Sequence, residues 1–112
     1  MITLGKVLVV NVRNYRGENI IYIGRKNVSW GFEGSILRNR IRDVGMSRDE
    51  SIERYRKELW FEIKKEGRVY EYLLELVEKL RKGEDITLGC WCKPKRCHGD
   101  IVKGCLEWML KK

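Results

Sequence analysis

The 112-residue chain contains no glutamine and no alanine, and it has a single proline and a single histidine. It also lacks any apolar run near the roughly 18 residues that a membrane-spanning helix needs, which argues against a membrane partner. The first ten residues, "MITLGKVLVV", have no basic stretch followed by a small-residue cleavage site, so they resemble a first strand more than a secretory signal. We therefore expect a cytoplasmic protein.

Charged residues fill much of the remaining composition. They make up 36% of the chain, and 24 basic against 16 acidic residues give a net charge of +8. A chain crowded with Lys, Arg and Glu is typical of a thermophile, in which intracellular disulfides do occur. The positive balance favours an anionic partner such as a nucleotide or a nucleic acid, but a solvated surface rich in ion pairs produces the same balance.

The hydrophobic periodicity predicts one domain over residues 1–112, because a chain of this length builds a single core. Short β-branched runs predict strands, and apolar residues spaced three or four apart predict amphipathic helices. The order β-β-α-α-β-α predicts a small α/β domain with a mixed or parallel sheet of three or four strands, packed by about three helices. The predicted strands cover 6–13, 20–25 and 85–92; the helical stripes are Ile52, Tyr55, Leu59 and Ile63, then Val69, Leu73, Leu76, Val77 and Leu80, and the last helix covers 98–112.

Two features between the second strand and the first helix depart from a simple pattern. "SRDE" (47–50) has the form of a capping box, in which Ser47 caps a helix and Glu50 reaches back. Before it, residues 26–45 form a long segment with mixed polarity and three glycines, within which "SILRNRIRD" (35–43) suits a short helix or an edge strand. A loop of this length in a small domain is usually functional.

The segment "LGCWCKPKRCHGD" (88–100) holds three of the four cysteines. Cys90 and Cys92 would share one face of a strand, and a turn through Pro94 would return Cys97 and His98 toward them. Three sulfurs and an imidazole can hold zinc tetrahedrally. However, the spacing differs from the usual separated pairs, so a zinc site made of Cys90, Cys92, Cys97 and His98 is one alternative among several.

The same segment also suits nucleophilic catalysis. Cys97 lies where a helix should begin, and the helix dipole together with nearby Lys and Arg side chains would favour its thiolate. His98 would act as acid or base, with Asp100 orienting it or capping the helix, where Asp100 would serve best as the N-cap. A third alternative is structural: Cys90 and Cys105 fill the core, or Cys97 or Cys105 forms a disulfide with the strand.

An anion site is the remaining alternative, and it involves two regions. Backbone N–H groups at a strand-to-helix turn bind phosphate, and so does a loop with a Gly-Arg pair such as "YIGRKNVSWGFEG" (22–34), where Trp30 or Phe32 could stack on a base. The residues that we expect to bind the anion are Arg13, Gly24, Arg25, Gly31, Lys93 and Arg96.

Four segments together resemble a known family: "VVNVR" (9–13), "YIGR" (22–25), "SRDESIERYRKELW" (47–60) and "LGCWCKPKRCHGDIVK" (88–103). They are similar to the small archaeal, bacterial and phage proteins called domain of unknown function 4326, whose pattern C-W-C-x-P-x-x-C-H-G-D is matched in full. The family's Gly-Asn-Pro-aromatic stretch is replaced here by "WGFEG" (30–34). The resemblance implies no activity, but it implies that the Gly-Arg loop and the Cys-His turn belong to one site.

From these patterns we expect an anion-binding protein that takes a nucleotide or nucleic-acid phosphate. The alternatives are a small Cys/His-dependent enzyme acting on the same ligands and a zinc- or disulfide-stabilised interaction module. Trp60, Phe61 and Trp108 suggest an apolar face that favours a homodimer, although ordinary amphipathic packing accounts for them as well.

Overall fold

The computed structural model describes residues 3–15, 17, 19–39, 45–93 and 95–111. Within these ranges the predicted order of strands and helices is confirmed, with one added 3-10 turn. Pro94 and residues 40–44, which include part of the predicted short helix or edge strand, lie outside the described residues. The elements are β1 (Val7–Asn11), β2 (Ile20–Tyr22), η1 (Val28–Trp30), α1 (Arg48–Lys65), α2 (Arg68–Arg81), β3 (Ile86–Cys90) and α3 (His98–Leu110).

The three strands form one parallel sheet with the order β1-β3-β2. Val7 of β1 pairs with Ile86 at the start of β3, and Tyr22 of β2 pairs with Gly89 near its end. The predicted α/β domain is therefore confirmed, and its sheet is parallel. Because all three strands run in the same direction, their carboxyl ends meet at one edge, where ligands of α/β proteins commonly bind.

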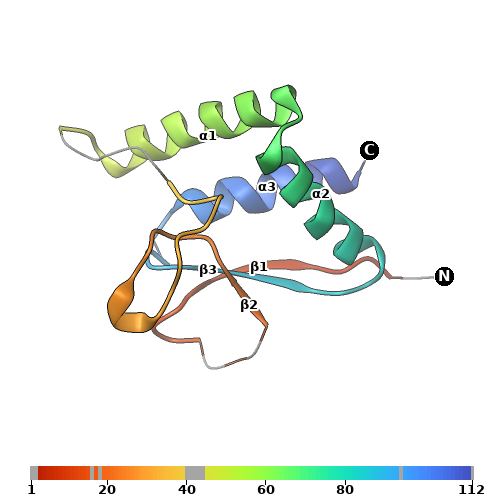
Figure 1. The fold of residues 1–112 in the computed structure, drawn as a ribbon, viewed down its shortest axis with the longest axis horizontal. Helices are drawn as coiled ribbons and strands as arrows, with labels where there is room; N and C mark the ends of the chain where they lie inside the picture. The colour runs from red at the N-terminus through yellow and green to blue at the C-terminus, as the bar shows by residue number, and fades with distance from the viewer. Residues whose placement is uncertain (1–2, 16, 18, 40–44, 94, 112) are drawn as a thin grey trace.

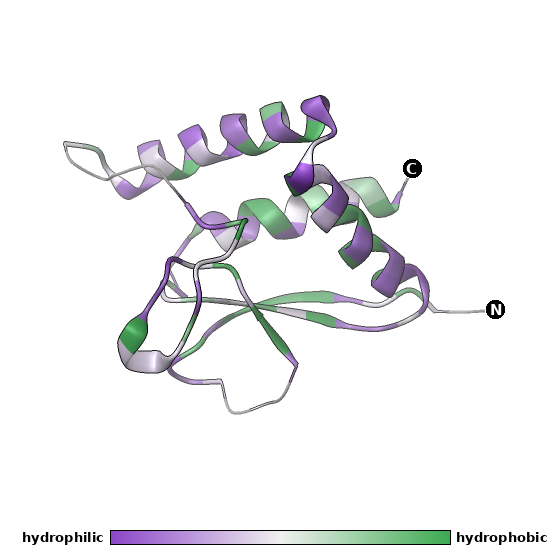
Figure 2. Cartoon of the chain, in the orientation of Figure 1, coloured by the Kyte–Doolittle hydropathy of each residue, from purple (hydrophilic) through white to green (hydrophobic). Residues whose placement is uncertain are grey.

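All three helices lie on one side of this sheet (Figure 1). Helices α2 and α3 pack against the strands, whereas α1 packs on α2 and α3 and forms an outer layer. Figure 2 shows hydrophilic residues along most of α1 and more hydrophobic ones along the strands and α3. In the described part of the chain, no helix combines the length and the apolar character needed to cross a bilayer.

The core lies between the sheet and the helices. Both predicted helical stripes are buried there, and Leu73, Val77 and Leu80 of α2 are fully inaccessible. Leu88 at the centre of β3 and Leu106 of α3 are also fully inaccessible. Full burial of such a side chain contributes roughly 1.5–3 kcal/mol, so this contact layer is the main source of stability.

The aromatic residues that favoured a homodimer lie on α1 and α3. Trp60 and Trp108 pack edge to face with ring centroids 4.9 Å apart. Phe61 is 60% exposed, and the ammonium of Lys65 lies over its ring. Contacts within one chain therefore account for part of the apolar surface, and the homodimer stays a prediction.

Candidate functional site

Two adjoining pockets lie at the carboxyl edge of the sheet. The helix pocket, about 270 Å³, lies between the first turns of α1 and α3. The loop pocket, about 320 Å³, lies between the segment after β2 and the segment after β3. The two pockets share Asn39, Cys92 and His98 in their walls. The Gly-Arg loop and the Cys-His turn therefore lie side by side.

His98 joins these two regions directly. It is the first residue of α3, and its Nε2 lies 2.7 Å from the carbonyl oxygen of Ile23, just before the Gly-Arg pair. Because a carbonyl only accepts hydrogen bonds, Nε2 carries the proton and Nδ1 is the acceptor nitrogen. No hydrogen bond from a described residue reaches Nδ1. Burial lowers the pKa of His98, and the nearby Arg25 adds to this effect, so the imidazole is neutral near pH 7.

Gly99 allows the start of α3 to approach the sheet closely. A Cβ at this position would lie 2.8 Å from Cγ1 of Val9 and 3.1 Å from Cδ1 of Ile23. Any side chain would therefore push the first turn of α3 away from β1 and from the end of β2. The glycine in the Cys-His-Gly-Asp sequence thus helps to set the distance between His98 and the Ile23 carbonyl.

The N-cap of α3 is Cys97, so the prediction that Asp100 is the N-cap is wrong. The helix begins at His98, which places Asp100 in its first turn at the third helical position. There its carboxylate accepts a hydrogen bond from the backbone N–H of Cys97 at 3.1 Å, in a capping box. This contact fixes the backbone of Cys97 and leaves its sulfur facing the end of β3.

Cys90 and Cys97 form a buried pair whose sulfur atoms are 3.1 Å apart. The hydrogen bond from Cys97 lowers the pKa of Cys90 to about 6, with further help from the backbone N–H groups of Cys92 and Lys93. The same contact, together with burial, raises the pKa of Cys97. The two thiols therefore share a proton, with the negative charge preferring Cys90.

Cys92 does not lie on the strand with Cys90, in contrast to the prediction. Strand β3 ends at Cys90, and the chain then turns, with the N–H of Lys95 donating to the carbonyl of Cys92 at 2.8 Å. In the described ranges, no three Cys, His, Asp or Glu side chains gather as a metal-binding group. The geometry thus brings Cys90 and Cys97 together, while Nε2 of the remaining predicted ligand, His98, is engaged by Ile23.

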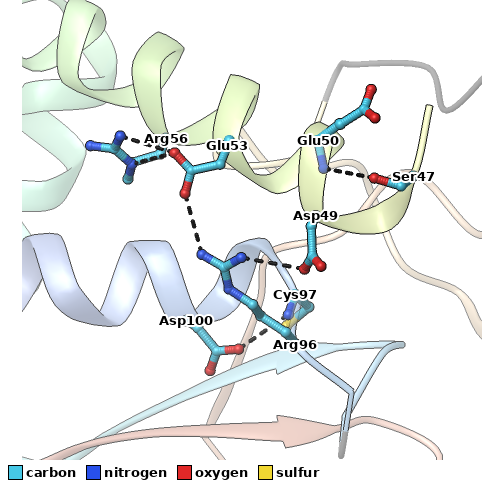
Figure 3. A network of polar contacts seen from close by, with 8 residues as sticks. All are labelled: Ser47, Asp49, Glu50, Glu53, Arg56, Arg96, Cys97 and Asp100. Carbon is cyan, nitrogen blue, oxygen red and sulfur yellow. Dashed lines mark hydrogen bonds and ion pairs between the residues drawn. The ribbon is translucent and has the colours of Figure 1, made fainter.

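Two cations that we expected to bind a ligand are paired with carboxylates. The ammonium of Lys93 lies 2.7 Å from Asp100. Burial alone would raise the pKa of Asp100, but Lys93 and the N–H of Cys97 outweigh it and lower that pKa. The guanidinium of Arg96 lies 3.4 Å from both Asp49 and Glu53 of α1. Figure 3 shows these two ion pairs bridging from Arg96 to α1. Lys93 thus connects the turn after β3 to the first turn of α3, and Arg96 connects the residue before α3 to α1.

Other cations line the pockets. Arg25 and Lys26 line the loop pocket, and Arg48, from the first turn of α1, lines the helix pocket. The Nε of Arg25 donates to the carbonyl of Asn39 at 2.9 Å, which positions the guanidinium beside the opening. Sequence reasoning found Arg25 but missed Lys26, Arg48 and Asn39. Lys26 follows Arg25 directly and was within reach, whereas Arg48 and Asn39 become part of the site only through packing.

Aromatic rings border the loop pocket. Tyr22 and Phe32 stack with centroids 4.3 Å apart, and the indole N–H of Trp91 donates to the Tyr22 hydroxyl at 2.7 Å. Trp30 packs edge-on against Trp91 and remains 51% exposed. Arg13 lies over the Trp91 ring, 5.5 Å from its centroid. Tyr22 and Trp91 line the pocket, so apolar ring surface lies next to its positive charge.

Gly24 and Gly31 lie in the same loop with different roles. Gly24 lines the loop pocket, close beside the ring of Tyr22. Gly31 ends η1 with a φ of 73°, a left-handed conformation that glycine adopts without strain. Gly31 therefore shapes the turn that carries Trp30.

The fold and the site define a small parallel α/β domain with a polar, cysteine-lined site at the carboxyl edge of its sheet. The model of the family described as Domain of unknown function (DUF4326) matches residues 10–108, so the chain belongs to that family. The resemblance found in the motifs is thereby confirmed.

One relative is an uncharacterised 12.4 kDa protein in the nrdA-td intergenic region of Enterobacteria phage T4. It is 37% identical over 70 residues, and the match covers 62% of this chain and 57% of the phage protein. No solved structure matches the chain.

Proposed function

We propose that this protein binds a phosphate-bearing ligand, a nucleotide or a single-stranded nucleic acid, at the carboxyl edge of its sheet. The observation that carries the proposal is the charge of the two pockets. Among the described residues that line them, three are cationic and none is acidic, in a chain that has 16 acidic residues. A surface of one sign in a concave site concentrates ligands of the opposite sign.

The helix pocket adds a second kind of positive potential. Arg48 and Ser51 come from the first turn of α1, and Cys97 and His98 come from the start of α3. The first N–H groups of a helix lack intrahelical partners, and the helix dipole places partial positive charge there. Two helix starts that face one pocket, with Arg48 beside them, suit a phosphate group.

The aromatic border suits the rest of a nucleotide. Trp30 offers a half-exposed indole beside Trp91, Arg13 lies over the Trp91 ring, and Lys26 lines the same pocket as Trp91. Base stacking on such rings contributes roughly 1–3 kcal/mol per base and tolerates any base sequence. The loop pocket, lined by Tyr22 and Trp91, can thus take a base, with Trp30 packed beside Trp91, while the cations hold a phosphate.

A second candidate function is acid–base catalysis on the same ligand, and the geometry of His98 favours it. Its ring is neutral, its tautomer is fixed by the Ile23 carbonyl, and Nδ1 is left to accept a proton. Cys97 is a weaker candidate nucleophile than the sequence suggested, because it is 1% exposed and its pKa is raised. If turnover occurs, His98 would be its proton acceptor.

The test uses a fluorescein-labelled single-stranded oligonucleotide, with unlabelled nucleotides and inorganic phosphate as competitors. We expect the double variant Arg25→Ala/Lys26→Ala to bind at least about tenfold more weakly and to show a smaller salt dependence. Arg54→Ala/Lys57→Ala removes the same charge from exposed positions of α1 and is the matched control. Competition by mononucleotides would identify a nucleotide site, and competition by long oligonucleotides alone would identify a nucleic-acid site.

Two results would contradict the proposal. An equal loss of affinity in both double variants would mean that only net charge matters. The absence of binding by any of these probes at millimolar concentration and low salt would leave the pockets without the proposed ligand class.

A further inference from the structure

We propose that Cys90 and Cys97 form a redox-active dithiol, which hydrogen peroxide converts reversibly into an intramolecular disulfide. This inference is independent of the proposed ligand. It rests on the placement of the two sulfur atoms, on the rigid elements that carry them, and on the pocket that gives access to one of them.

The two sulfur atoms lie close enough to bond after a small movement. The sulfur atoms are 3.1 Å apart, and a disulfide has an S–S length of about 2.05 Å, so closure requires a movement of about 1 Å. All four cysteines lie in the described ranges and are free, and this is the sulfur–sulfur contact that the structure records among them. Cys105 lies farther along α3 and is buried in the apolar core.

Rigid elements of the fold carry both cysteines. Cys90 is the last residue of β3, the central strand, and Cys97 is the N-cap of α3. The capping box with Asp100 fixes the backbone of Cys97, and Gly99 seats the helix start on the sheet. Because both backbones are fixed by secondary structure, the sulfur atoms stay close, which gives their reaction a high effective concentration.

The helix pocket gives access to one of the two sulfur atoms. Cys97 lines the helix pocket of about 270 Å³, whereas Cys90 lies behind it and is completely inaccessible. A peroxide is small enough to enter this pocket and reach Cys97. The proton of the pair can reside on either sulfur, because either atom can donate in the contact. The negative charge prefers Cys90 at rest, but transfer of the shared proton across the 3.1 Å contact to Cys90 places the thiolate on Cys97, the sulfur that lines the pocket.

The chemistry balances in two steps. The Cys97 sulfur attacks one oxygen of hydrogen peroxide, the O–O bond breaks, and the departing hydroxide takes a proton from solvent and becomes water. The Cys97 sulfenic acid that results is attacked by the Cys90 sulfur, which gives up its proton. The S–O bond breaks, and the second hydroxide and that proton form another water. Two thiols are oxidised, and one peroxide is reduced to two waters.

The experiment is thiol mapping of the folded chain after treatment with stoichiometric hydrogen peroxide. We expect the intact mass to fall by two hydrogens and dithiothreitol to restore four free thiols. Trypsin cuts after Lys82, Lys95, Arg96 and Lys103, so the disulfide should join peptide 83–95 to peptide 97–103. Because peptide 83–95 also contains Cys92, the Cys92→Ser variant must give the same linked pair. The link should form at least about tenfold faster in the folded chain than in guanidinium, where fixed proximity is lost.

Three results would overturn the proposal. The link could disappear in Cys92→Ser, which would assign it to Cys92. Cys97 could instead accumulate as a sulfinic acid without any link, which would show that Cys90 does not reach it. Finally, equal rates of link formation in the folded and denatured chain would show that the fold does not prepare the pair.

Discussion

The two ends of the central strand β3 differ more than its short length suggests. At the amino end, Ile86 is buried and its N–H donates to the carbonyl of Lys6 at 2.8 Å. At the carboxyl end, Cys90 contacts another sulfur, and the next residues line pockets. Backbone hydrogen bonds hold both ends, since Val12 and Ile23 donate to the carbonyls of Cys90 and Gly89, but only the carboxyl end adds reactive side chains such as the Cys90–Cys97 pair.

The amino end leaves little room for variation. The N–H of Gly5 donates to the carbonyl of Leu80 at 2.8 Å, and a Cβ on Gly5 would lie 1.8 Å from the carbonyl oxygen of Glu84. The backbone N–H of Lys6 donates to Asp85 at 2.8 Å. These contacts join β1, α2 and β3 tightly. One strand can therefore contribute mainly to stability at its amino end and carry reactive side chains at its carboxyl end.

The largest effect that would test this separation is expected at the amino end. Ile86→Ala should lower the free energy of unfolding by about 2–5 kcal/mol, because it leaves a cavity under α2 and α3. Chemical denaturation measures the loss. At a temperature where the variant remains folded, its affinity for the oligonucleotide should equal that of the unchanged chain. A large loss of affinity in the folded variant would show that the two ends are coupled.

A medium effect is expected from pH at the carboxyl end. Burial lowers the pKa of His98 below its ordinary value of about 6.5, so the unfolded chain binds a proton that the folded chain does not. This group's contribution is complete above pH 6.5 and is lost as the pH falls, at no more than about 1.4 kcal/mol per pH unit. His98→Gln, which keeps an N–H for the Ile23 carbonyl, should reduce the slope of stability between pH 6 and 5.

Cys90 provides an internal control for that experiment. Its pKa in the folded chain is about 6, against about 8.5–9 when unfolded, so its stabilising effect is lost as the pH falls from 9 to 6. That slope should survive in His98→Gln. An unchanged slope below pH 6 in this variant would mean that His98 is not the group that titrates there.

The smallest effect is expected from Arg96→Ala. Its ion pairs with Asp49 and Glu53 are long and largely exposed, so we expect a loss of no more than about 1 kcal/mol in the free energy of unfolding. Oligonucleotide affinity should change no more than it does in Arg54→Ala. A selective loss of affinity in Arg96→Ala would return this residue to the ligand site, as the sequence pattern predicted.

The sequence was informative where chemistry is local. Apolar spacing predicted both stripes of α1 and α2, and the cap at Ser47 is confirmed by its Oγ accepting from the N–H of Glu50 at 3.2 Å. The order of elements and the α/β class followed from the same periodicity. The strands were predicted too long at their carboxyl ends, although Val12 and Ile23, just past β1 and β2, still donate backbone hydrogen bonds to β3.

The sequence was less informative where partners are distant in the chain. It could not show that Arg96 meets α1, that Lys93 meets Asp100, or that His98 reaches the Ile23 carbonyl. Each of these pairings depends on how helices dock on the sheet. The central position of β3 could not be predicted from the sequence either, because the order in which strands pair depends on the whole packed arrangement.

The central position of β3 also determines when the sheet can form. Strands β1 and β2 come early in the chain, but each pairs only with β3 within the described sheet, and the contact between Lys6 and Asp85 spans 79 positions. A ribosome must therefore deliver both long helices before either early strand finds its partner. Until then the valine-rich β1 segment has no strand partner, so this non-local pairing makes folding slow and leaves an apolar strand unpaired during synthesis.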